Sequence, residues 1–123
     1  MAEADIQQGA WLGPDEVLAR AESDARLAAI VEALRGVFDP EIPLNIFDLG
    51  LVYGLRLDAQ GRVGIRMTLT SPACPVAGSL PGQVQRAVAA VPGVEEVAVE
   101  LVWDPPWSRE RIGEAGRLEL GIY

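Results

Sequence analysis

The chain of 123 residues is half hydrophobic and 23% charged, a composition that fits one folded domain and excludes a disordered chain. Eighteen acidic residues against ten arginines, with no lysine or histidine, give a net charge of −8, so we expect no nucleic-acid partner. No run approaches the roughly 18 apolar residues of a membrane span. The first residues also lack the cationic start of a secretory signal, so we expect a cytoplasmic protein with no membrane contact.

The sequence divides into a short arm and one domain. Residues 1–22 are expected to form a peripheral N-terminal arm, in which Pro14 can open a short helix. Residues 23–123 are expected to form a single domain. Its first element is an amphipathic helix from Ser23 to Phe38, because apolar residues recur there at steps of three and four. Ser23 or Asp24 is placed to cap its start.

A hairpin and a second helix follow. Pro40 and Pro43 end the first helix, since proline disfavours helical conformation in the residue before it. Helical spacing from Val76 to Val91 predicts the second helix, with Pro81 either in its first turn or kinking it. Between the helices, alternation on both sides of a turn at 59–61 predicts a β-hairpin with one core face. The expected core residues are Leu51, Tyr53, Leu55, Leu57, Val63, Ile65, Met67 and Leu69.

A third strand completes the expected fold. Alternation from Val97 to Trp103 predicts this strand, and the helix before it implies that it runs parallel to the second hairpin strand. The fold class is therefore α+β: a two-layer helix-hairpin-helix-strand domain with a small mixed sheet and helices on one face. After Ser108 the chain is expected to add a short helix or a further strand.

Cys74 is the first candidate for chemistry. It lies in the segment Ser71-Pro72-Ala73-Cys74-Pro75, between the hairpin and the second helix. The prolines stiffen the backbone and leave amides free to face an anion, which favours the thiolate that binds soft metals. The alternative is a buried, inert cysteine. As the only cysteine, it excludes an internal disulfide and a four-thiolate metal site within one chain.

Three acidic residues lie in or next to the proline-stiffened loop. Asp39, Glu41 and Asp48 follow the first helix, and in a small domain their loop can lie beside the loop that carries Cys74. Carboxylates and a thiolate together would make an incomplete metal or cluster site. The alternative is that Asp39 and Asp48 only hold turns.

Two tryptophans flank a proline pair after the third strand. Trp103, Asp104 and Trp107 are candidates for binding a partner protein, because an aromatic residue behind two prolines suits a rigid contact. The alternative is that the two indole rings close the end of the core. The sequence has no glycine-rich phosphate loop, serine-histidine arrangement or zinc-ligand spacing.

Four motifs stand in order between about Leu27 and Gly121: DPEIPLNIFDLGLVY at 39–53, MTLTSPACP at 67–75, LVWDPPW at 101–107 and EAGRLELG at 114–121. They resemble the SufT-like family of iron-sulfur cluster assembly factors. That family is related to the eukaryotic cytosolic iron-sulfur targeting component and to the PaaD subunit of phenylacetate degradation.

The resemblance implies a role in maturing iron-sulfur proteins rather than the turnover of a substrate. It implies that Cys74 is the functional thiol and that the acidic loop with Asp39, Glu41 and Asp48 is the second element. The expected cargo is a transient iron-sulfur cluster or iron, and the expected partners are the assembly machinery and apo-client proteins. Because one chain supplies too few thiolates, a cluster bridged across a homodimer is one arrangement.

Two other functions remain as alternatives. The first is an interaction adaptor that binds no metal and holds clients or a scaffold through the Trp103 to Trp107 edge and the acidic surface. The second is a thiol enzyme with Cys74 as its nucleophile. The absence of histidine and the negative charge of the chain both disfavour thiolate activation and therefore the enzyme.

Overall fold

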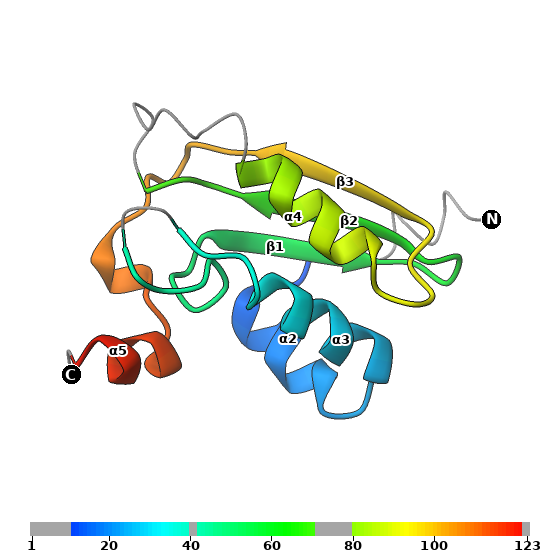
Figure 1. Cartoon of the computed structure of the whole chain (residues 1–123), viewed down its shortest axis with the longest axis horizontal. Helices are drawn as coiled ribbons and strands as arrows, with labels where there is room; N and C mark the ends of the chain where they lie inside the picture. Colours follow the sequence, from blue (N-terminus) through cyan, green and yellow to red (C-terminus); the bar gives the residue numbers. More distant parts are fainter. Residues whose placement is uncertain (1–10, 40–41, 71–79, 122–123) are drawn as a thin grey trace.

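The computed structural model describes residues 11–39, 42–70 and 80–121, and Figure 1 shows its elements. None of the helices in these ranges is long and apolar enough to cross a membrane. In chain order the elements are α2 (Pro14–Ala21), α3 (Ala25–Leu34), β1 (Val52–Leu57), β2 (Arg62–Met67), α4 (Leu80–Ala89), β3 (Glu96–Leu101), the 3-10 helix η1 (Arg109–Arg111) and α5 (Glu114–Leu120).

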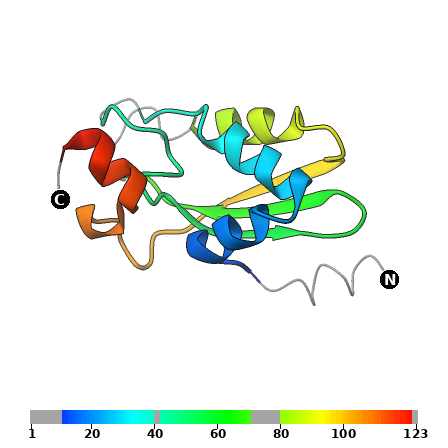
Figure 2. The same ribbon diagram turned by 90° about the horizontal axis from the view of Figure 1, so that it is seen from below.

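The three strands form one mixed sheet in the order β1-β2-β3. β1 pairs antiparallel with β2, and β3 pairs parallel with β2, because α4 carries the chain back along the sheet between them. Helices α3 and α4 lie on one face of the sheet, and α2 packs beside α3 (Figure 1 and Figure 2). The predicted α+β fold with a small mixed sheet is confirmed. The segment after Ser108 forms η1 and α5 rather than a strand.

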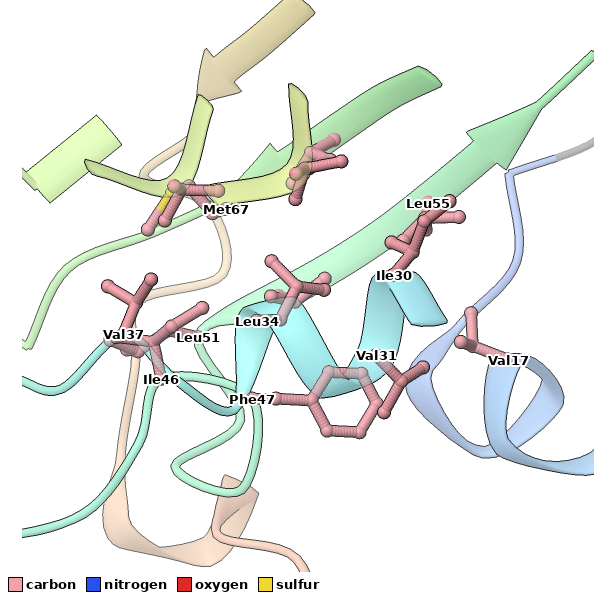
Figure 3. Close-up of a cluster of buried hydrophobic side chains, with 14 of the residues drawn as sticks. Val17, Ile30, Val31, Leu34, Val37, Ile46, Phe47, Leu51, Leu55 and Met67 are labelled. Carbon is pink, nitrogen blue, oxygen red and sulfur yellow. The ribbon is translucent and has the colours of Figure 1, made fainter. Parts of the chain in front are cut away.

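Helix α3 supplies much of the core. It starts after Asp24, whose carboxylate accepts a hydrogen bond from the backbone N–H of Leu27 at 3.1 Å, as expected of an N-cap residue. Its apolar side chains meet those of the sheet and of the loop before β1 (Figure 3). Fully buried members of this cluster are Ile30, Leu34, Ile46, Leu51, Leu55 and Met67.

Phe38 does not join this apolar face. Helix α3 ends at Leu34, so the helical period does not carry Phe38 to the core. Phe38 instead forms an antiparallel bridge with Asn45 and its side chain is 58% exposed.

Helix α4 begins at Leu80. Pro81 therefore lies in the first turn, where a missing N–H breaks no helical hydrogen bond. The alternative of a kink is wrong. Residues 71–79, with Cys74 among them, lie outside the described residues.

The core face of β1 differs from the expected alternation at Tyr53. The pairing of β1 with β2 shifts between Val52 and Gly54, so Val52 is buried and Tyr53 is only partly covered. The Tyr53 hydroxyl donates a hydrogen bond to the carbonyl oxygen of Pro105 at 2.8 Å, and the Arg111 guanidinium lies over its ring. Burial raises the pKa of Tyr53, against the opposing effect of the Arg111 charge. This irregularity thus ties β1 to the segment after β3.

Asp58 closes the turn between β1 and β2. One carboxylate oxygen accepts hydrogen bonds from the backbone N–H groups of Gln60 and Arg62, and the other pairs with the Arg62 guanidinium, all at 2.9 Å. Burial opposes the charge of Asp58, but the hydrogen bonds and the positive charge of Arg62 outweigh it and lower its pKa. The carboxylate therefore fixes the hairpin in its charged form.

Residues 11–21, which the sequence places in the peripheral arm, pack on the sheet. Leu12 exchanges two backbone hydrogen bonds with Leu55 at 2.9 and 3.0 Å, which extends the β1 edge by one bridge. Helix α2 then places Val17 in the core with 0% of its side chain exposed. Part of the predicted arm is therefore built into the domain.

Trp11 rests on the sheet face opposite α3 and α4. A Cβ added to Gly54 or Gly64 would lie 3.2 or 3.0 Å from the Trp11 ring, so the two glycines make room for it. The guanidinium groups of Arg56 and Arg66 each lie 4.2 Å from the ring centre, a distance at which a cation is attracted to the ring. The N-terminal segment is thereby held at both its strand bridge and its indole ring.

We expect Val17→Ala to lower the free energy of unfolding by about 2 kcal/mol, because it leaves a cavity under α2. Leu18→Ala is the matched control on the same helix, since Leu18 is 38% exposed, and should change stability by less than about 0.5 kcal/mol. Urea unfolding measures both values. Equal small effects would mean that α2 is not part of the folded unit.

Candidate functional site

One end of the sheet gathers those of the singled-out residues that the structure describes. The loop before β1, the end of β2 and the segment after β3 meet at the end where β2 and β3 finish (Figure 1). Backbone hydrogen bonds join them: the Thr68 N–H donates to the Leu51 carbonyl oxygen at 2.8 Å, and the Val102 N–H donates to that of Met67 at 2.9 Å. We refer to residues 37–51 as the acidic loop.

The Asp48 side chain and backbone both make hydrogen bonds within or next to the acidic loop. One carboxylate oxygen pairs with the Arg35 guanidinium at 3.2 Å, and the other accepts a hydrogen bond from the Asn45 side-chain amide at 2.9 Å. The Asn45 side chain in turn accepts from the Asp48 backbone N–H at 2.8 Å. Both carboxylate oxygens are therefore engaged, which agrees with the alternative that Asp48 holds a turn.

Asp39 is buried at the start of the same loop, with 7% of its surface exposed. Its carboxylate accepts a hydrogen bond from the Ile42 backbone N–H at 2.9 Å, and its own N–H donates to the Leu44 carbonyl oxygen at 3.2 Å. A buried carboxylate with a backbone donor is held in one orientation. Asp39 thus has the fixed placement that a ligand or a turn residue requires.

The segment after β3 braces the acidic loop from outside. The Trp107 indole N–H donates to the Leu49 carbonyl oxygen at 2.7 Å, and the Gly113 N–H donates to that of Asp48 at 2.9 Å. Helix α5 lies flat on the loop, since a Cβ on Gly116 would approach the Leu44 side chain to 2.7 Å and the Asp48 carbonyl oxygen to 2.8 Å. A segment far from the acidic loop in sequence therefore fixes it.

The two tryptophans share one hollow but differ in exposure. The hollow has a volume of about 370 Å³ and is lined by Thr68, Leu69, Thr70, Trp103, Pro106 and Trp107. Trp107 is half-buried and packs on the core, which agrees with the alternative that it closes the core end. Trp103 is 46% exposed, and Asp104 beside it is exposed as well.

The structure brings together only part of the predicted metal site. Asp39 and Asp48 share one loop, while Glu41 and Cys74 lie outside the described residues. Among the residues that the structure describes, no three Asp, Glu, Cys or His side chains gather closely enough to hold a metal ion. Thr68 was not singled out from the sequence. Its place in the motif at 67–75 and its polar type directly after β2 are the signals that could have pointed to it.

Residues 27–101 match the model of the iron-sulfur cluster assembly protein family. This range runs from α3 to the end of β3 and includes the acidic loop. The chain therefore belongs to the iron-sulfur cluster assembly protein family, and within it the chain is similar to the Fe-S protein maturation auxiliary factors. The predicted resemblance to SufT-like proteins is confirmed.

Individual relatives share most of the chain. The Fe-S protein maturation auxiliary factor of Porphyromonas gingivalis is 45% identical over 93 residues, which are 76% of this chain and 89% of that protein. The auxiliary factor SufT of Staphylococcus aureus is 36% identical over 86 residues, 70% of this chain and 98% of that protein. A crystal structure of a domain of unknown function, DUF59, from Bacillus anthracis matches with a TM-score of 0.72 and 37% sequence identity. The match covers 85% of this chain and 99% of the Bacillus anthracis chain.

We expect Gly50→Ala to destabilise the site strongly. Gly50, near the end of the acidic loop, has φ of +80°, and an added Cβ would collide with the Arg111 carbonyl oxygen, so the loss should be about 3 kcal/mol of unfolding free energy. Gly121→Ala is the matched control, since Gly121 has φ of +76° with nothing within 4 Å and should lose about 1 kcal/mol. Urea unfolding compares them, and equal losses would show that the loop and the Arg111 backbone are not in contact.

Proposed function

We infer that this protein is an auxiliary factor in iron-sulfur cluster assembly or delivery to client proteins. The observation that carries the proposal is family membership over residues 27–101, together with the fixed placement of the Asp39 and Asp48 carboxylates at one end of the sheet. Relatives at 36 and 45% identity are named Fe-S protein maturation auxiliary factors. The proposed activity is the handling of a cargo rather than catalysis, and the proposed location is the cytoplasm.

The proposed contact with the cargo is Cys74. Its thiolate is a soft ligand suited to iron or to an iron-sulfur cluster. Asp39 and Glu41 are the proposed carboxylate partners, and the fixed orientation of Asp39 supports its place. For Asp48 we propose a structural role, because its two carboxylate oxygens already contact the Arg35 guanidinium and the Asn45 side-chain amide. It holds the shape of the loop rather than the cargo.

The number of thiolates limits how the cargo is held. A cluster needs several cysteine ligands, and this chain has one. We propose that the remaining ligands come from a second copy of the chain or from the donor and client proteins. The cluster is then bound only in passing, as transfer requires. The proposed partners are the assembly machinery and apo-client proteins.

The second candidate function is an adaptor that binds no metal. The exposure of Trp103, at 46%, favours it, since a large aromatic side chain left in solvent is typical of a protein contact. The two functions differ in one observable, the binding of iron.

Anaerobic reconstitution with iron and sulfide tests the choice. We expect the wild type to show iron and a visible thiolate-to-iron band, and Cys74→Ser to lose both, because a hydroxyl is a poor soft-metal ligand. Asp39→Asn should reduce the iron per chain, while Asp15→Asn, a change of an exposed acid on α2, should not. Iron analysis and absorbance measure the outcome. No iron in the wild type, or equal iron in Cys74→Ser, would favour the adaptor.

A further inference from the structure

The two edges of the sheet differ in how the chain protects them. The order β1-β2-β3 leaves β1 and β3 at the edges, and Figure 1 shows β3 along one border of the sheet. Leu12 covers part of the β1 edge through its two backbone hydrogen bonds with Leu55. Among the residues that the structure describes, no segment pairs with the outer side of β3. An unpaired strand edge is a template for a further strand.

The free backbone groups of β3 belong to every second residue. The Val102 N–H donates to the Met67 carbonyl oxygen at 2.9 Å, so Val102 directs its backbone groups toward β2. Because these groups alternate between the two sides of a strand, the odd-numbered residues of β3 direct theirs outward. The Val97 carbonyl oxygen agrees with this, since it accepts a hydrogen bond from the Gln85 side-chain amide at 3.2 Å. Within the described part of the chain, no partner meets the outward N–H groups of Val97, Val99 and Leu101.

The strand β3 is regular along its length. Exposed edges are commonly protected by a proline, a bulge or a very short strand. β3 has six residues, none of them proline, and its pairing with β2 is continuous from Glu96 to Leu101. Its outer edge is therefore open to pairing over the whole strand.

Acidic side chains select which strand can pair there. Glu96 and Glu100 are exposed on β3. Glu100 pairs with Arg66 at 3.3 Å, but the two side chains are 61% and 43% exposed, so this ion pair is weak. Antiparallel pairing of two β3 strands around Ala98 would place the Glu96 and Glu100 carboxylates of the two copies opposite each other, which is destabilising. The edge therefore disfavours a second copy of this chain, whose net charge is −8, and favours a basic strand.

The side chains on the other face of β3 are apolar. Val97 is buried, and Val99 and Leu101 are partly buried against the core. Residues opposite each other in neighbouring strands share a face. An added strand would thus place one set of side chains beside these apolar residues and the alternate set beside Glu96 and Glu100. The matching strand alternates apolar and basic residues.

We propose that the outer edge of β3 binds an extended segment of a protein partner, in which basic residues alternate with apolar β-branched ones. Pairing is antiparallel, the slightly more stable arrangement. Main-chain hydrogen bonds supply affinity and the alternating side chains supply specificity. β3 ends two residues before Trp103, which is 46% exposed, at the end of the sheet that carries the acidic loop. The added segment therefore reaches the candidate site, and its role as part of a client or assembly protein rests on the proposed function.

Two peptides of opposite charge test the edge. Ac-Lys-Val-Lys-Val-Lys-Val-Lys-amide and Ac-Glu-Val-Glu-Val-Glu-Val-Glu-amide are titrated into ¹⁵N-labelled full-length protein, and the amide signals of β3 are followed by NMR. We expect the lysine peptide to bind about tenfold more tightly or better, because attractive cross-strand pairs with Glu96 and Glu100 replace repulsive ones. Equal binding of the two peptides, or no response to the lysine peptide, would overturn the inference.

Amide exchange separates strand addition from loose electrostatic attraction. With about 90% of the protein bound, exchange at the outward amides of Val99 and Leu101 should slow about tenfold. The amides of Ala98 and Glu100, which face β2, should change less. The lysine peptide with every valine N-methylated keeps its charge but loses the N–H groups that antiparallel pairing uses, and should give no protection. Protection that survives N-methylation, or that rises with protein concentration without peptide, would contradict the proposed occupant.

Variants of the two acids test the charge selection. Glu96→Gln combined with Glu100→Gln should lower the preference for the lysine peptide several-fold, and as exposed changes they leave the fold intact. Glu16→Gln combined with Glu22→Gln is the matched control, since these exposed acids lie on and directly after α2, and it should leave the preference nearly unchanged. Equal effects of the two double variants would reduce the selection to net charge and overturn the role of the edge.

Iron loading keeps this inference separate from the proposed function. Normal iron loading with no peptide response overturns only strand addition at β3. An intact peptide response with no iron in the wild type overturns only the cargo role.

Discussion

The architecture of the candidate site depends on the placement of Asp48. Its carboxylate joins Arg35, at the end of α3, to Asn45 in the same loop, and its carbonyl oxygen accepts the Gly113 N–H that anchors α5. Side chain and backbone of one residue thus connect α3, the acidic loop and α5. With 15% of its side chain exposed, the ion pair with Arg35 is shielded more than a surface pair, and removal of one partner is correspondingly costly. A loop held in this way can present Asp39 in a single orientation.

The other contacts at this end of the sheet follow from that loop. Trp107 and Gly116 close on it from the segment after β3, and Tyr53 and Arg111 hold the same segment against β1. Trp103 is left outside this packing, beside the hollow that contains Thr68. The proposed function uses both parts: a fixed loop with carboxylates for the cargo, and an open aromatic surface for a protein that supplies or receives it.

The sequence predicts those elements whose signal is local. The α3 period, its Asp24 cap and the hairpin alternation all depend on near neighbours, and the structure confirms them. Phe38, Tyr53 and Trp11 depend on distant contacts: an early helix end, an irregular strand pairing and two glycines on adjacent strands. The periodicity of apolar residues in the sequence therefore cannot predict where these three side chains lie. Among the site residues, the motif pattern points to Asp39 and Asp48. Only the structure reveals that the Asp48 carboxylate is paired with the Arg35 guanidinium and that the Thr68 hydroxyl is buried.

Native-state hydrogen exchange of Asp48→Ala tests the central role of this residue most directly. If Asp48 holds the site together, the amides of Ile42, Leu49 and Gly113 should exchange faster, by about tenfold, because a partly buried charge pair worth about 1.4 kcal/mol is lost locally. Amides of α4 and β3 should keep their wild-type rates. Unchanged exchange in the acidic loop and at Gly113, or an equal rise at every amide, would contradict the account.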